Sequence, residues 1–111
     1  MTDIRMGIVE DDKRIQDALR TIISGATDML ITSMHGNAEE AIAAISVNCP
    51  DVVIMDINLP GASGVECVRE LRQRCADTQF LMYTMHDDDR FVFDALKSGA
   101  NGYLLKSAKP G

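Results

Sequence analysis

The chain has 111 residues, which suits one domain with a single core, and its 46% apolar and 25% charged content is ordinary for a globular protein. Its formal charge of −6 argues against direct binding of nucleic acid, because contacts with phosphates need a basic surface. No stretch approaches the roughly 18 consecutive apolar residues of a membrane span, and the first residues lack the layout of a signal peptide. We therefore expect a cytoplasmic protein that does not contact a membrane.

Short apolar runs alternate with amphipathic stretches from the N-terminus onwards. The run from Ile4 to Val9 predicts a first strand, and an apolar stripe at spacings of three and four, from Ile15 to Ile23, predicts a helix that Gly25 closes. Met29 to Met34 predicts a second strand. Asn37 is a suitable N-cap for a second helix, in which the apolar stripe recurs. Asp12 is read in the same way, as the cap of the first helix.

The segment from Asp51 to Asp56 is apolar on both faces, as expected of a central parallel strand that is covered by helices. Residues 58–64 have the composition of a loop. A third helix is predicted from Val65 to Cys75, with three arginines on its solvated side: Arg69, Arg72 and Arg74.

The last third of the chain repeats the alternation. Phe80 to Thr84 predicts a fourth strand, Phe91 to Leu96 a fourth helix, and Tyr103 to Leu105 a fifth strand. Five strands that alternate with four helices indicate an open parallel α/β sheet. A fifth helix is expected where the sequence stops at residues 108–111, so we interpret residues 1–111 as one domain truncated before its fifth helix.

The three cysteines, Cys49, Cys67 and Cys75, are odd in number and have no CxxC spacing. This pattern argues against a disulfide framework and against a zinc site. We expect reduced thiols.

Polar side chains of matching chemistry follow four of the predicted strands. Glu10 and Asp11 follow the first strand, Asp56 ends the third, Thr84 ends the fourth and Lys106 follows the fifth. Ligands of open α/β sheets bind at the carboxyl ends of the strands. Clustered carboxylates need a cation, and their hard oxygens suit Mg²⁺ or Mn²⁺. An ionised aspartate beside a metal is a nucleophile towards phosphorus, while an ammonium and a hydroxyl stabilise the transferring phosphoryl group.

Four motifs carry a family resemblance: IVEDD, VVIMDINLPGASG, FLMYT and GYLLK. Together they span nearly the whole chain, which resembles a response-regulator receiver domain of a two-component system. The stretch DDDRFVFDALKSGANGYLLK further resembles the NarL/FixJ-type subfamily, whose members carry a LuxR-type helix-turn-helix effector. The resemblance implies a flavodoxin-like, doubly wound, five-stranded sheet in the order 2-1-3-4-5.

The resemblance also implies roles for the residues at the carboxylate cluster. Asp56 is the expected phosphoacceptor, and Asp11 the expected direct ligand of Mg²⁺. Glu10 is expected to act through water, and the backbone carbonyl of Asn58 to complete the protein ligands.

Three further residues are expected to read the phosphorylated state. Lys106 pairs with the phosphoryl oxygens, Thr84 moves towards them, and Tyr103 swings inward behind Thr84. The switch is expected on the face of helix four and strand five. The resemblance implies a sensor histidine kinase as the phosphoryl donor and is compatible with a homodimer. It implies contact with DNA only through an effector domain that is absent from this chain. The receiver assists its own phosphorylation and dephosphorylation but is not an enzyme.

Two positions depart from the family pattern. Met85 replaces a small residue beside Thr84, which suggests slow reaction with small phosphodonors, and Ser107 replaces a common proline, so no cis peptide is assumed there. Met85 also favours one alternative, a phosphorylation-independent receiver that acts as an interaction module. A flavodoxin-like cofactor binder is opposed by the acidic residues 10–12, which would repel a phosphate. A haloacid-dehalogenase-type phosphatase is opposed by Asn58, where that chemistry uses a second aspartate.

Overall fold

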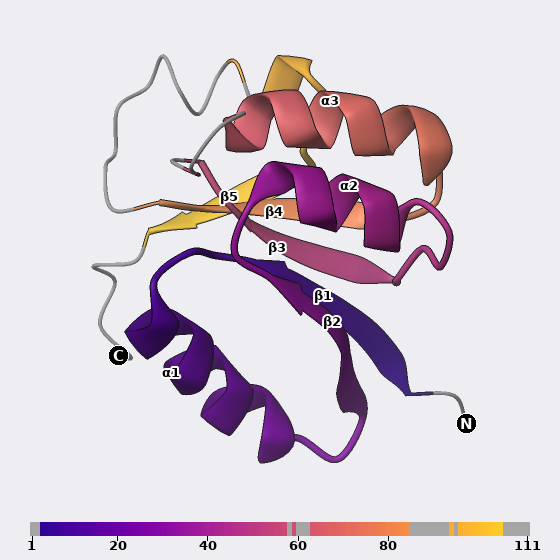
Figure 1. Cartoon of the computed structure of the whole chain (residues 1–111). Helices are drawn as coiled ribbons and strands as arrows, with labels where there is room; N and C mark the ends of the chain where they lie inside the picture. Colours follow the sequence, from indigo (N-terminus) through magenta and orange to yellow (C-terminus); the bar gives the residue numbers. More distant parts are fainter. Residues whose placement is uncertain (1–2, 58, 60–62, 85–93, 95, 106–111) are drawn as a thin grey trace.

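The structure is a computed structural model, and it describes residues 3–57, 59, 63–84, 94 and 96–105. Strands and helices alternate along these residues (Figure 1), with the bounds β1 Ile4–Val9, α1 Lys13–Ser24, β2 Met29–His35, α2 Ala38–Ile45, β3 Val52–Asp56, α3 Gly64–Arg74, β4 Gln79–Thr84 and β5 Gly102–Leu105. Of the predicted fourth helix, Phe91 to Leu96, residues 94 and 96 are helical and the others lie outside the described residues; residue 97 is helical as well.

All neighbouring strands pair in parallel, in the order β2-β1-β3-β4-β5. The predicted fold class and strand order are therefore confirmed. β3 lies at the centre, and its last four residues, from Val53 to Asp56, are all buried. The β1–β3 pairing runs without interruption from Met6 opposite Val52 to Val9 opposite Met55. The β1–β2 pairing has a register irregularity between Met6 and Gly7.

The sheet is covered by α2 and α3 on one face and by α1 on the other (Figure 1). Under α2 and α3, the core includes Val53, Met55 and Phe80 from the sheet and Leu71 from α3. Ile8 and other sheet residues pack with α1 in a second, smaller core that also contains Met6, Leu19, Ile23 and Ile54. Burial of each such aliphatic side chain contributes about 1.5–3 kcal/mol. Ile22, which the apolar stripe placed in the core, is 67% exposed.

Side-chain caps begin α1, α2 and α3. The carboxylate of Asp12 accepts from the amide of Arg14, and the side-chain oxygen of Asn37 accepts from the amide of Glu40. Both predicted caps are thus confirmed. Ser63 caps α3 by accepting from the amide of Glu66, although the sequence reading assigned it only to a loop. Each cap stabilises its helix by about 1 kcal/mol.

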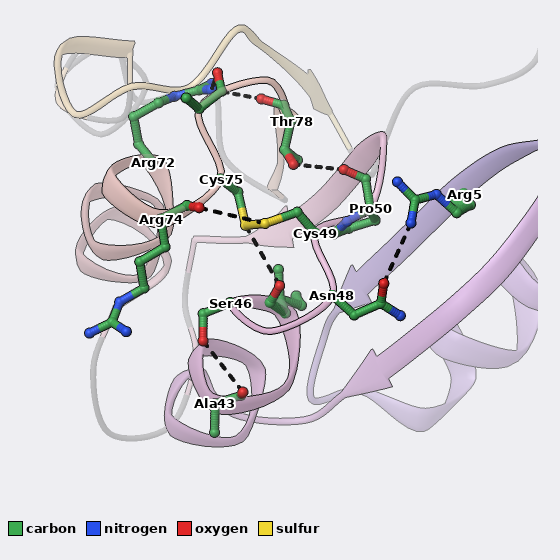
Figure 2. Close-up of a disulfide and its surroundings, with 12 residues drawn as sticks. Arg5, Ala43, Ser46, Asn48, Cys49, Pro50, Arg72, Arg74, Cys75 and Thr78 are labelled. Atoms are coloured by element: carbon green, nitrogen blue, oxygen red, sulfur yellow. Dashed lines mark hydrogen bonds between the residues drawn. A yellow bond between two sulfur atoms is a disulfide. The ribbon is translucent and has the colours of Figure 1, made fainter.

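The expectation of reduced thiols is wrong for two of the three cysteines. Cys49, between α2 and β3, forms a disulfide with Cys75 at the end of α3, and their Cα atoms lie 5.6 Å apart (Figure 2). Cys67 is free and buried. The two bonded cysteines are 26 residues apart and meet only because β3 and α3 lie against one another. The spacing of cysteines along the sequence cannot predict this contact between distant segments.

The solvated position predicted for Arg72 is also wrong. Its guanidinium donates to the carbonyls of Thr78 and Gly99, each at 2.7 Å, and to the side chain of Asn101 at 2.6 Å. These acceptors lie in the turns before β4 and β5, so the Arg72 side chain connects α3 to both turns.

Among the described residues, no helix has the length and apolar character needed to cross a membrane.

Candidate functional site

The candidate site forms where β1 and β3 end side by side. Val9 is aligned with Met55, so the next residue of each strand, Glu10 and Asp56, reaches the same level at the edge of the sheet. The amide of Glu10 donates to the carbonyl of His35 at 2.9 Å, which ties this end of β1 to β2 as well. The backbone therefore holds both acidic residues in place before any side-chain contact is considered.

Three carboxylates gather at this edge. Glu10, Asp11 and Asp56 each offer an oxygen, and these oxygens lie within 4.8 Å of one another. Glu10 is only 1% exposed and Asp56 5%, whereas Asp11 is exposed. Negative charges this close repel, and burial raises the cost of keeping them ionised. A small divalent cation offsets both effects, and an all-oxygen donor set fits Mg²⁺. The residues present therefore fit the expected metal.

The start of α1 shapes the first half of the site. The second carboxylate oxygen of Glu10 accepts from the amide of Asp12 at 3.2 Å, and the backbone carbonyl of Glu10 accepts from the side chain of Gln16. Asp12 itself is engaged with Arg14, whose hydrogen bonds hold the pKa of that carboxyl below its usual value. Asp12 thus serves the helix, as expected, while Glu10 and Asp11 face the cluster.

The segment after β3 shapes the second half. Ile57 and Leu59 are buried in the larger core and anchor this segment. The amide of Gly64 donates to the carbonyl of Ile57 at 2.8 Å, which brings the first turn of α3 against the end of β3. A Cβ atom at position 64 would meet the carbonyl oxygen of Asp56. Only glycine allows this close approach, so Gly64 positions the site, whereas the sequence indicated no more than a loop-shaping role.

Of the remaining predicted site residues, the structure describes Thr84 and Tyr103 but not Asn58 and Lys106. Thr84 ends β4 opposite Leu105 of β5, one residue beyond Tyr83, which is aligned with Asp56. Its backbone therefore reaches the same edge of the sheet. Tyr103 lies on β5 and is 47% exposed. Asn58 and Lys106, together with Met85 and Ser107, lie outside the described residues.

Comparisons with known proteins agree with this architecture. The family model of the response regulator receiver domain matches residues 6–111. The chain is 35% identical to the transcriptional regulatory protein DegU of Brevibacillus brevis over 93% of this chain and 44% of that protein. It is 31% identical to the uncharacterized transcriptional regulatory protein YxjL of Bacillus subtilis, over 96% of this chain and 49% of YxjL. The chain thus spans about half the length of these curated relatives.

A solved structure supports the same comparison in three dimensions. The LuxR-family two-component response regulator from Aurantimonas sp. SI85-9A1 superposes with a TM-score of 0.91 at 31% identity, covering 98% of this chain and 78% of that one. The similarity therefore extends over both faces of the sheet and the edge that carries the carboxylates.

Proposed function

Because the chain belongs to the response regulator receiver family, we propose that it accepts a phosphoryl group on Asp56 from a phosphohistidine of a sensor kinase. The observation that carries this proposal is the carboxylate cluster, in which buried Asp56 lies with Glu10 and Asp11 at the carboxyl edge of the sheet. Receiver domains are generally not catalytic enzymes. The chemistry proposed here is accordingly one acceptance and one later loss of the phosphoryl group.

In the acceptance step, a carboxylate oxygen of Asp56 attacks phosphorus, the new O–P bond forms, and the P–N bond to the donor imidazole breaks. The burial of Asp56 excludes bulk water from the face of the carboxylate that packs into the protein. The fixed alignment of β1 with β3 holds the attacking oxygen in position. Positioning of this kind is the main contribution of proteins to phosphoryl transfer.

Mg²⁺ would be held by Asp11 and Asp56, by Glu10 through water, and by the backbone carbonyl of Asn58. When bound, it offsets the negative charge that the carboxylates and the phosphoryl oxygens bring together. We further propose that Thr84 and Lys106 contact the phosphoryl oxygens and that Tyr103 follows Thr84 inward. The exposed position of Tyr103 leaves its side chain room for such a movement.

The partners and the location belong to the same proposal. We assign the protein to the cytoplasm, where its kinase would present the phosphohistidine. The matched relatives are about twice as long as this chain, and DegU and YxjL are both named as transcriptional regulatory proteins. We therefore propose that the phosphorylated face of helix four and β5 controls a DNA-binding effector domain, with a homodimer as one route to that control.

Intact mass tests the proposal directly. The protein is incubated with Mg²⁺ and acetyl phosphate, or with a cognate kinase, and one phosphoryl adduct is expected. Asp56→Asn abolishes the adduct, whereas the matched control Asp28→Asn, an exposed aspartate far along the sheet from the cluster, retains it. Absence of an adduct with every donor contradicts the proposal and favours a phosphorylation-independent interaction module.

A further inference from the structure

The disulfide lies at the opposite end of β3 from the carboxylate cluster. Cys49 precedes β3 by three residues, and Cys75 follows the last residue of α3. The bond therefore closes a ring of chain that contains β3, the segment after Asp56 and the whole of α3. Figure 2 shows the two sulfur atoms between the end of α2 and the end of α3. Asp56 belongs to this ring, although it lies at its far side.

The two cysteines differ in exposure. Cys75 is only 2% exposed, whereas Cys49 is half-buried. Both cysteines line a cavity of about 380 Å³, which Arg5, Asp51 and Asp77 also line, together with Arg74, Pro50, Ala76 and Thr78. Two arginines and two aspartates line this cavity; Arg5 pairs with Asp51 at 3.5 Å and Arg74 with Glu70 at 3.1 Å. Charges of both signs at one cavity suit a zwitterionic thiol of the glutathione class, which would compete with these exposed ion pairs. Of the two residues, Cys49 is the more exposed, so we take its sulfur as the one that a thiol attacks.

The surroundings accommodate the reduced form as well. The sulfur of Cys49 lies 3.6 Å from the carbonyl oxygen of Arg74, and the sulfur of Cys75 lies 3.6 Å from that of Ile45. The two bonded sulfurs must move apart on reduction, and each thiol then has a backbone carbonyl nearby as an acceptor. The hydroxyl of Thr78 also donates to the carbonyl of Pro50 at 2.6 Å, so the two segments stay joined when the disulfide opens.

The location assigned under the proposed function adds a further argument, and this step alone depends on that assignment. Cytosolic reductants keep most thiols reduced, and a disulfide that forms there is usually transient or redox-sensing. A pair with one partly exposed cysteine and a backbone acceptor near each sulfur suits reversible exchange.

We propose that Cys49 and Cys75 are a reversible redox pair that exchanges with a small thiol through this cavity. The thiolate attacks the sulfur of Cys49, giving a mixed disulfide, and Cys75 leaves as a thiolate that takes up the proton. A second thiol then attacks the mixed disulfide, which releases Cys49 and yields the oxidised form of the small thiol. Two thiols are oxidised for each protein disulfide reduced. Opening the ring removes one of the attachments between β3 and α3, and we infer that the segment around Asp56 becomes more mobile.

The exchange is tested with the whole chain in buffers of defined ratio of reduced to oxidised glutathione. The protein is acid-quenched and unfolded, its free thiols are alkylated, and the labels are counted by intact mass. The expected result is one labelled thiol, Cys67, at low ratio and three at high ratio, with the two additional thiols appearing together. The matched control Cys67→Ser is expected to show the same midpoint. A pair that stays closed at every ratio, or never forms at any, overturns the proposal.

Single variants identify the attacked sulfur. With oxidised glutathione, Cys75→Ser is expected to form a mixed disulfide on Cys49 at least about tenfold faster than Cys49→Ser forms one on Cys75, because reaction follows exposure of the sulfur. Equal rates contradict the assignment. Circular dichroism of both variants establishes that they fold. The rate at which reduced glutathione opens the disulfide of the wild type measures the same exchange without any substitution.

Hydrogen exchange tests the link to the site. The amide of Gly64 is bonded to the carbonyl of Ile57, close to Asp56. In the reduced protein this amide is expected to exchange at least about threefold faster than in the oxidised protein. An unchanged rate overturns the inferred link between the pair and the site. None of these measurements uses phosphorylation, so their failure is distinguishable from failure of the proposed function.

Discussion

The guanidinium of Arg72 lies 4.7 Å from the centroid of the Phe80 ring and stacks above it. Phe80 is fully buried at the start of β4, and the same guanidinium donates to the carbonyls of Thr78 and Gly99. Gly99 has a φ of 121°, and a Cβ atom there would press against the Arg72 side chain. Arg72 thus fastens α3 to β4 and to the turn that leads into β5.

Replacing Arg72 by lysine is expected to lower the free energy of unfolding by about 2–3 kcal/mol, because an ammonium cannot reproduce the planar fork or the stacking. Urea denaturation measures the change. The control Arg69→Lys alters an exposed arginine of the same helix, which among the described residues donates to Ser98 at 3.3 Å, and it is expected to change stability by less than about 0.5 kcal/mol. Equal effects of the two substitutions would contradict the role given to Arg72.

Gly64→Ala is expected to destabilise the protein by about 2 kcal/mol or more and to slow phosphorylation of Asp56, because the added methyl group meets the Asp56 carbonyl. Denaturation and the rate of adduct formation with acetyl phosphate give the two readings. Gly25→Ala is the matched control: position 25 has a φ of −79°, and its Cβ would find no atom closer than 3.6 Å. If position 64 tolerates alanine as well as position 25 does, the close approach is unimportant.

Asp11→Asn is expected to weaken Mg²⁺ binding while raising stability in chelator, because one of three mutually repelling charges is removed. Thermal unfolding with and without Mg²⁺ measures both effects. The wild type should gain more from Mg²⁺ than the variant, since a ligand bound only to the folded state stabilises it. Asp17→Asn, which alters an exposed aspartate on α1, should behave as the wild type does. A wild type that gains nothing from Mg²⁺ would argue against a metal at these carboxylates.

Reduction of the disulfide is expected to lower the free energy of unfolding by about 2–4 kcal/mol, because opening a ring of 26-residue separation restores freedom to the unfolded chain. Urea denaturation with and without a strong dithiol reductant measures this. Cys49→Ser should match the reduced wild type and should not respond to the reductant. A reductant effect that persists in Cys49→Ser would show that another group is responsible.

The buried thiol of Cys67 predicts a pH dependence. Burial, with a contribution from Glu39, raises the pKa of this thiol from its ordinary 9.0 to about 12. The folded protein therefore holds the proton more tightly than the unfolded chain, and stability falls as pH rises above about 9. Between pH 8 and pH 10 the loss from this group is about 1.4 kcal/mol. Cys67→Ala should lack this part of the decline, and an identical decline in both proteins would contradict the raised pKa.

The sequence allowed prediction of features that depend on periodicity and on strand ends. Alternating runs indicated the parallel sheet, and the rule that ligands bind at carboxyl edges indicated that Glu10, Asp11 and Asp56 would meet. Contacts between distant segments were not predictable in this way. Arg72 carries a charge on a helix whose other arginines are solvated, and only the packed turns before β4 and β5 provide its acceptors.

The same limit explains the other two misjudged features. The pairing of Cys49 with Cys75 depends on how α3 returns beside the start of β3. The requirement for glycine at position 64 depends on the distance between two backbones, which no composition rule contains. Both features depend on how α3 packs beside β3, one at each end of the strand.

The uninterrupted pairing of β1 with β3 has a consequence for how such a chain can change in evolution. One residue added to or removed from either strand moves its end by about 3.3 Å and turns the last side chain to the opposite face. Glu10 would then no longer stand level with Asp56. The irregularity between Met6 and Gly7 falls on the β1–β2 pair and leaves the β1–β3 pair undisturbed. Insertions are thus tolerable on the β2 side of the sheet, whereas the number of residues leading to Glu10 and to Asp56 is as constrained as the two carboxylates themselves.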